Sequence, residues 1–325
     1  TGANNTTVGN GAGSANIADS LTAVGSNAAT ANTSGANNVA VGKEALTRNT
    51  SGSSNVALGK DALAFNTTAS YNTAVGHFAL SSLVGGGATL NTAIGSDAMA
   101  NTTTGTNNVA LGASALAANT TASNNTAVGY YALQSNTASN NVALGWGSAY
   151  QNTSGTANTA LGYYALQSNT TASNNTAVGY QAAYSNTTGT SNVALGYTAL
   201  LNNTTASQSI AIGYQAGKSQ TTLGANTFVG NDAGRDVTGQ QNAFYGHDSG
   251  RLVTSGQKNT IIGSYDGNQG GLDIRTSSNN IVLSDGDGNP WMWHGGSSQE
   301  GLEFYNSWAD NKNVRFVIVT GDGGA

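Results

Sequence analysis

The chain has 325 residues, a mass of 32.4 kDa and a net charge of −5, and only 8% of its residues are charged. Ten Lys and Arg residues over that length do not form the basic stripe that nucleic-acid binding requires, so we expect no nucleic-acid partner. The absence of Cys excludes disulfide scaffolds and thiolate metal sites. No apolar run approaches the ~18 residues of a membrane span, so we expect no membrane insertion.

The sequence is nevertheless strongly periodic, although its glycine-rich polar composition alone would be typical of disorder. A Gly that follows Val, Leu or Ile in 15 of 16 units recurs at a spacing of 17 residues, with a few spacings of 16 and one of 19. The repeated glycines are Gly9, Gly25, Gly42, Gly59, Gly76, Gly95, Gly112, Gly129, Gly145, Gly162, Gly179, Gly196, Gly213, Gly230, Gly246 and Gly263. Sixteen units at a nearly fixed period predict a solenoid.

Each unit contains the run Asn-(Val/Thr)-Ala-(Val/Leu)-Gly, which alternates with period two and predicts a short β-strand. We expect the first and third strand residues to face the interior and the central Ala to face outward. A tight turn at the Gly, a second short strand and a polar Asn-Thr loop would then complete one coil. The prediction is an all-β parallel solenoid of about sixteen coils, roughly 75 Å long at the usual strand spacing.

The Asn four residues before the Gly is present in 14 of the 16 units, and Asn125 and Asn141 are examples. We expect these side chains to stack into a buried ladder in which each Asn bonds to the next coil.

A stripe of alanines occupies the centre of the predicted strands and is too apolar and too small for a solvent-exposed face. We interpret it as the surface through which identical rods associate around a cyclic axis. The predicted interface residues are Ala110, Ala127, Ala143, Ala160, Ala177 and Ala194.

The repeat unit resembles the left-handed parallel β-roll of trimeric autotransporter adhesin heads, although those units are usually shorter. The longer version here, Asn-Thr-Ala-Val-Gly-Tyr-x-Ala-Leu-x-Ser-Asn-Thr, is similar to repeats of bacteriophage tail-fibre proteins, and so is the segment 277–289. This resemblance implies a left-handed, homotrimeric viral fibre that attaches to a receptor on the host surface, with a glycan as the expected ligand. A self-cleaving chaperone domain often follows such repeats, and no residues here match one.

Three regions are expected along the chain. Residues 1–217 carry the regular repeat, and residues 218–272 form a variant in which Phe228, Phe244 and Ile261 replace the central Ala. Residues 273–325 leave the repeat and are expected to form a small β-rich trimeric cap.

The residue after the Gly is aromatic in six successive units. This aromatic track consists of Tyr130, Trp146, Tyr163, Tyr180, Tyr197 and Tyr214. Stacked coils place these rings on one line, where they either stabilise the rod by stacking or bind sugar rings.

The C-terminal region contains a second group of aromatic side chains, which either form the core of the cap or a receptor-binding tip. The candidates for receptor binding are Trp291, Trp293, His294, Tyr305 and Trp308. Nearby, Asp285, Asp287 and Asn289 alternate like calcium ligands but lack the later Glu of that motif, so we interpret them as a hairpin turn and expect no metal or cofactor.

No catalytic arrangement is indicated, and we expect a structural or adhesive protein rather than an enzyme. Carboxylates that a glycosidase could use are Asp232, Asp236, Asp248, Glu300 and Glu303. The alternatives to a virion tail fibre are a bacterial surface adhesin head, an ice-binding solenoid and a polysaccharide-cleaving tailspike. Ice binding is disfavoured because Thr and Val alternate in the first strand column, which suits an inward position better than an ice-binding face.

Overall fold

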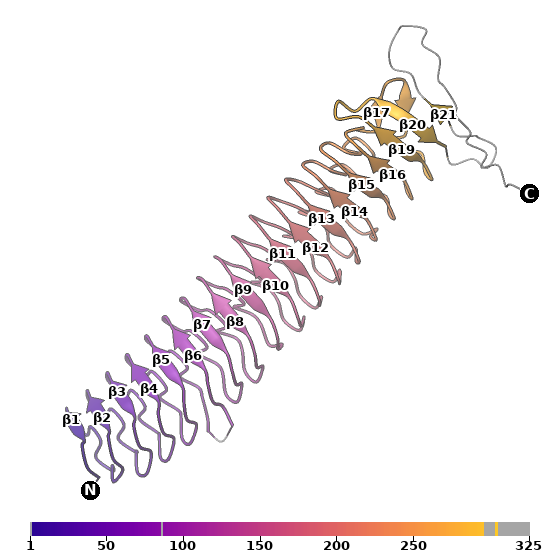
Figure 1. Ribbon diagram of the computed structural model, residues 1–325. Helices are drawn as coiled ribbons and strands as arrows, with labels where there is room; N and C mark the ends of the chain where they lie inside the picture. Colours follow the sequence, from indigo (N-terminus) through magenta and orange to yellow (C-terminus); the bar gives the residue numbers. More distant parts are fainter. Residues whose placement is uncertain (1, 86, 296–302, 305–325) are drawn as a thin grey trace, which may run out of the picture.

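The computed structural model of the chain is a straight rod of stacked coils (Figure 1), and it describes residues 2–85, 87–295 and the backbone of 303–304. Sixteen three-residue strands form its long sheet: β1 (Thr6–Val8), β2 (Thr22–Val24), β3 (Val39–Val41), β4 (Val56–Leu58), β5 (Thr73–Val75), β6 (Thr92–Ile94), β7 (Val109–Leu111), β8 (Thr126–Val128), β9 (Val142–Leu144), β10 (Thr159–Leu161), β11 (Thr176–Val178), β12 (Val193–Leu195), β13 (Ile210–Ile212), β14 (Thr227–Val229), β15 (Ala243–Tyr245) and β16 (Thr260–Ile262). Nothing in the described part of the chain forms a helix that could span a membrane. The predicted all-β solenoid is confirmed.

Consecutive strands are parallel and pair in the same register, so each residue lies beside its counterpart in the next coil. In the pairing of β8 with β9, for example, Ala127 is opposite Ala143 and Val128 is opposite Leu144. Each repeat column of the sequence therefore becomes a straight line of side chains along the rod.

The predicted orientation of the strands is wrong. The central alanines, among them Ala127 and Ala143, are completely buried within the single chain, whereas Leu144 is 51% exposed. The same holds for the predicted interface residues Ala110, Ala160, Ala177 and Ala194, which are all 0% exposed. The physical reason is size, because a coil of about 17 residues encloses little space. One Ala per strand fits in this interior beside the Leu of the following segment, whereas the two larger side chains at the first and third strand positions would not fit.

The segment after each Gly is not a second strand. In the coil of Gly129, Tyr131 and Leu133 have φ values of 60° and 51°, and most other coils repeat this pattern of left-handed residues. Their amides still bond between coils, since Tyr131 N donates to Ala113 O at 3.2 Å and Leu133 N donates to Ser148 O at 3.0 Å. The alternating conformation turns the Ala and Leu of this segment toward the interior.

The predicted Asn ladder is confirmed. Asn125, Asn141 and Asn158 are buried. The backbone N–H of Asn141 donates to Oδ1 of Asn125 at 2.9 Å, and the backbone N–H of Asn158 donates to Oδ1 of Asn141 at 3.0 Å. These side chains satisfy backbone amides that the curved coil would otherwise leave unpaired.

A second Asn ladder lies seven residues after the Gly, in what the sequence indicated only as a polar loop. Asn152 Nδ2 donates to Asn136 Oδ1 at 2.6 Å, and Asn169 Nδ2 donates to Asn152 Oδ1 at 2.7 Å. All three side chains are fully buried, so this loop is part of the interior rather than a solvent-exposed connection.

The variant coils exchange large and small residues inside the core. Phe228 and Phe244 replace the central Ala and are fully buried, while Gly217, Gly234 and Gly250 stand where most other coils carry Leu, Met or Ala. Cβ atoms at these glycines would collide with the two Phe rings. The Phe residues therefore fill the core of their own chain.

The rod ends in an antiparallel addition. Strand β19 (Ile281–Ser284) continues the parallel stack on β16, then pairs antiparallel with β20 (Pro290–His294), which pairs with β21 (Glu303–Phe304). A small ribbon of β17 (Asn268–Gln269) and β18 (Leu272–Asp273) projects beside it.

Candidate binding surfaces

The aromatic track forms one continuous stack along the rod. Successive ring centroids are 5.8, 5.3, 5.4, 5.1 and 5.2 Å apart from Tyr130 to Tyr214, with interplanar angles between 3° and 23°. The rings lie on one line, as the sequence predicts. At these separations the faces of the inner rings cover one another, so the track presents mainly ring edges to solvent.

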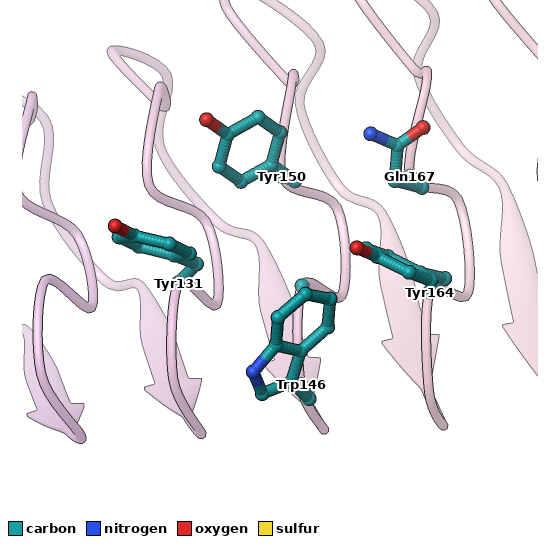
Figure 2. Close-up of a pocket in the computed structure, with 6 residues that line it drawn as sticks. Tyr131, Trp146, Tyr150, Tyr164 and Gln167 are labelled. Atoms are coloured by element: carbon teal, nitrogen blue, oxygen red, sulfur yellow. The ribbon is translucent and has the colours of Figure 1, made fainter.

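Beside the track lies a shallow depression of about 230 Å³ that the sequence did not reveal. Figure 2 shows Tyr131 and Tyr164 edge-on to its two sides, with Trp146 and Tyr150 between them, and all these side chains come from the segments that follow the strands. The residues that line the depression are Tyr131, Trp146, Gly147, Tyr150, Tyr164 and Gln167.

The rings around the depression meet at steep angles. Tyr164 packs edge-to-face on Trp146 with centroids 4.6 Å apart and an interplanar angle of 77°, and Tyr131 meets Tyr150 at 5.8 Å and 64°. Desolvation by the neighbouring rings, together with Tyr163 and Tyr184, raises the pKa of Tyr164 above its ordinary value. Its hydroxyl is therefore a neutral donor and acceptor at physiological pH.

The surrounding shaft is uncharged. Residues 98–217 contain no Asp, Glu, Lys, Arg or His, so the depression lies within a long stretch without ionisable groups other than tyrosines. Its polar atoms are the tyrosine hydroxyls, the indole N–H and the amide of Gln167. Such a surface favours neutral ligands.

A second depression of about 230 Å³ lies near the N-terminal end and differs in charge. It is lined by Glu44, Thr47, Arg48, Asp61, Ala64, Phe65 and Phe78. The Arg48 guanidinium lies 4.2 Å from the centroid of the Phe65 ring and covers one of its two faces.

The outer face of the strands is apolar and exposed along the rod. We call this strip, formed by the first and third residue of each strand, the strand face. Its most exposed large side chains are Val8, Val56, Leu58, Ile94, Val109, Leu111, Val142, Leu144, Val178, Ile210, Ile212, Tyr245 and Ile262. The exposed apolar surface of the strands is therefore this face and not the predicted stripe of alanines, which is buried.

The C-terminal candidates for receptor binding differ in how exposed their side chains are. Trp291 is 58% exposed on β20, whereas Trp293 is partly buried against the core and its Nε1 donates to Oδ1 of Asn280 at 3.1 Å. His294 is half-buried. Tyr305 and Trp308 lie outside the described residues. The structure therefore leaves Trp291 as the exposed aromatic residue of this group on the described part of the chain.

The loop 285–289 is the turn of the β19–β20 hairpin. The Asp285 carboxylate accepts hydrogen bonds from Asp287 N at 3.0 Å, Asn289 N at 2.8 Å and Trp291 Nε1 at 3.2 Å. Desolvation raises the pKa of Asp285, but these donors outweigh it and leave the pKa below its ordinary value. Among the described residues no group of three His or carboxylate side chains could hold a metal ion.

The acidic residues of the variant coils are engaged with arginines. Arg235 pairs with Asp236 at 2.9 Å and reaches Asp232 at 4.0 Å, and Arg251 pairs with Asp248 at 3.3 Å. The side chains of Glu300 and Glu303 lie outside the described residues.

Comparisons with models of protein families, with curated proteins and with solved structures find no match for this chain.

Proposed function

We propose that the chain is the shaft of an extracellular attachment fibre, a homotrimeric viral tail fibre that binds a glycan receptor on its host. The exposed apolar strand face carries this proposal. Valine, leucine and isoleucine side chains that are 36–58% exposed follow one another along the rod, and nothing in the described chain covers them. A monomeric soluble protein rarely leaves so long an apolar strip in water.

Self-association is the simplest way to bury the strand face. Because every strand pairs in the same register, the strip is straight, and an identical strip on a second copy matches it along its length. Cyclic association of rods buries the same strip on each chain. The resemblance of the repeat to trimeric adhesin heads and tail fibres supports a copy number of three.

Native molar mass tests the assembly. We expect light scattering on purified 1–325 to give about three times 32.4 kDa. Leu111→Arg combined with Leu144→Arg should lower the mass toward that of one chain, whereas Thr120→Arg, on an exposed loop, should leave it unchanged. A monomeric wild-type chain would overturn the trimeric fibre.

Attachment is tested separately, with the labelled wild-type protein on a panel of bacterial strains and immobilised glycans. We expect saturable binding to a subset of strains, and its removal by competing soluble glycan. Binding to no strain and no glycan would overturn the attachment function even if the protein is trimeric, and release of shortened glycans would identify a tailspike instead.

One observation favours ice binding more than the sequence did. The Thr and Val residues of the first strand column face outward, so their mixture no longer argues for an inward position. The third column, however, is Val, Leu or Ile rather than Thr in every strand except β15, which has Tyr245, and both columns together form an apolar strip. Thermal hysteresis from a monomeric rod would establish this alternative over the trimeric fibre.

A further inference from the structure

We propose that the depression around Gly147 is a binding site for a single neutral hexopyranose on the side of the shaft. This inference rests on the proposed attachment function and places one glycan contact away from the C-terminal tip.

The depression exists because Gly147 interrupts a column of side chains. Its counterparts in the two adjacent coils are Tyr131 and Tyr164, with φ values of 60° and 55°, and Gly147 has 62°. The neighbours show that this backbone conformation accepts a side chain, so the local backbone does not require Gly. A Cβ atom at Gly147 would lie 2.5 Å from Cε1 of Tyr164, and Tyr164 therefore occupies part of the space that the glycine leaves.

The size and lining of the depression fit one sugar ring. A volume of about 230 Å³ lies below the roughly 300–1,000 Å³ of pockets for larger ligands, so it holds one ring and not a long oligosaccharide. Among the described residues, the ring of Tyr150 contacts one other ring, that of Tyr131. In Figure 2 the Tyr131 ring is seen edge-on and the Tyr150 ring face-on. An aromatic face that no other ring stacks on suits the C–H face of a pyranose, and the amide of Gln167 and the tyrosine hydroxyls suit its hydroxyl groups.

The charge of the surroundings selects a neutral sugar. No lining residue is charged, and residues 98–217 hold no ionisable group except tyrosines. A sialic acid or a sulfated sugar would lose water around its negative charge without gaining a cationic partner, which costs free energy. In the depression lined by Arg48 and Phe65, the guanidinium covers one face of the Phe65 ring and the lining is charged, and we assign it no neutral sugar.

The test uses saturation-transfer NMR on the intact wild-type chain with methyl β-D-glucopyranoside, methyl β-D-galactopyranoside and the methyl glycoside of N-acetylneuraminic acid. We expect saturation transfer to the C–H protons of at least one neutral glycoside, with millimolar affinity, and none to the anionic one. Binding of the anionic glycoside alone would overturn the proposal.

Two variants address the site, and two matched variants serve as controls. Gly147→Gln fills the depression with a residue that the same column carries at Gln181, and Tyr150→Ala removes the aromatic face. Both should weaken binding of the neutral glycoside at least tenfold. Ser114→Gln, in the same column two coils earlier, and Tyr214→Ala, at the far end of the track, should change it less than twofold.

The result separates this proposal from the attachment function. If wild type binds host cells or glycans and Gly147→Gln binds equally well, the shaft site is wrong and attachment resides elsewhere, with Trp291 as the next candidate. If wild type binds no cell and no glycan, the proposed function fails as well. Circular dichroism of each variant identifies a loss caused by misfolding, and Ser114→Gln and Gly147→Gln together show whether a glutamine in this column is tolerated.

Discussion

The backbone of Gly234 packs so closely on the ring of Phe228 that a Cβ atom at Gly234 would overlap the ring carbons. In the regular coils the same two columns hold Leu and Ala, so the variant coils fill a similar volume with the large residue on the other side of the core. Volume-conserving exchanges of this kind are the ones that protein cores tolerate best.

We therefore predict strong coupling between the two positions. Phe228→Ala should destabilise the protein by about 3–5 kcal/mol through the cavity it leaves, and Gly234→Leu should destabilise it by about 1–3 kcal/mol through overpacking. The double variant should be more stable than the sum of the single effects predicts, because Leu restores part of the lost volume. Urea denaturation measures all three, and strict additivity would show that the two residues do not share one space.

A second prediction contrasts the adjacent residues Ala143 and Leu144. Ala143 is fully buried and Leu144 is 51% exposed, so the same substitution to Arg should have different effects. Ala143→Arg places an unpaired charge in the core and should cost ~3 kcal/mol or more, whereas Leu144→Arg should change the stability of the single chain by less than ~0.5 kcal/mol. Thermal unfolding measures both, at a concentration where the chains are dissociated; similar losses would contradict the observed orientation of the strand.

The sequence predicted the architecture better than the orientation of its residues. Period, register and the ladder through Asn125 follow from the repeat, because stacking in register forces identical residues into columns. Alternation in a strand shows that Ala143 and Leu144 face opposite sides of the sheet, but it does not show which of the two faces the interior. Because the coil is narrow, the smaller residue, Ala143, is the one that faces the interior. The left-handed residues such as Tyr131 and Leu133 leave no signal in composition. The depression depends on one interruption at Gly147, which is visible only when the column two residues after the repeated Gly is compared across coils.

A third prediction concerns the Asn ladder. Asn125→Ala removes the acceptor of the Asn141 amide and leaves a buried N–H without a partner, which should cost about 1–3 kcal/mol. Asn125→Ser should cost less, because Ser209 occupies the same column naturally and its Oγ accepts from Asn226 N at 3.4 Å. Denaturant midpoints compare the two variants, and equal losses would show that the acceptor is not what stabilises this column.

Acid should act on the ends of the rod before its middle. The hydrogen bonds from Arg275 lower the pKa of Asp273 to about 2. Because this pKa is lower than in the unfolded chain, the stabilisation by Asp273 is present above pH ~4 and is lost as the pH falls toward 2. Residues 98–217 have no carboxylate to protonate. Limited pepsin digestion at pH 2 should therefore remove terminal segments and leave a fragment that contains residues 98–217, whereas early cleavage within that stretch would contradict the expectation.

Apart from Trp146, which lines the depression around Gly147, the aromatic track should stabilise the rod and not bind sugar. Tyr180 stacks between Tyr163 and Tyr197 with centroid separations of 5.4 and 5.1 Å, so both of its faces are covered. Tyr180→Ala removes two ring contacts worth about 0.5–1.5 kcal/mol each, and thermal unfolding should report that loss. The binding of the neutral methyl glycoside should stay within twofold of wild type, because Tyr180 does not line the depression around Gly147. A variant of unchanged stability that loses glycoside binding would reverse the assignment and make the stacked track the sugar-binding surface.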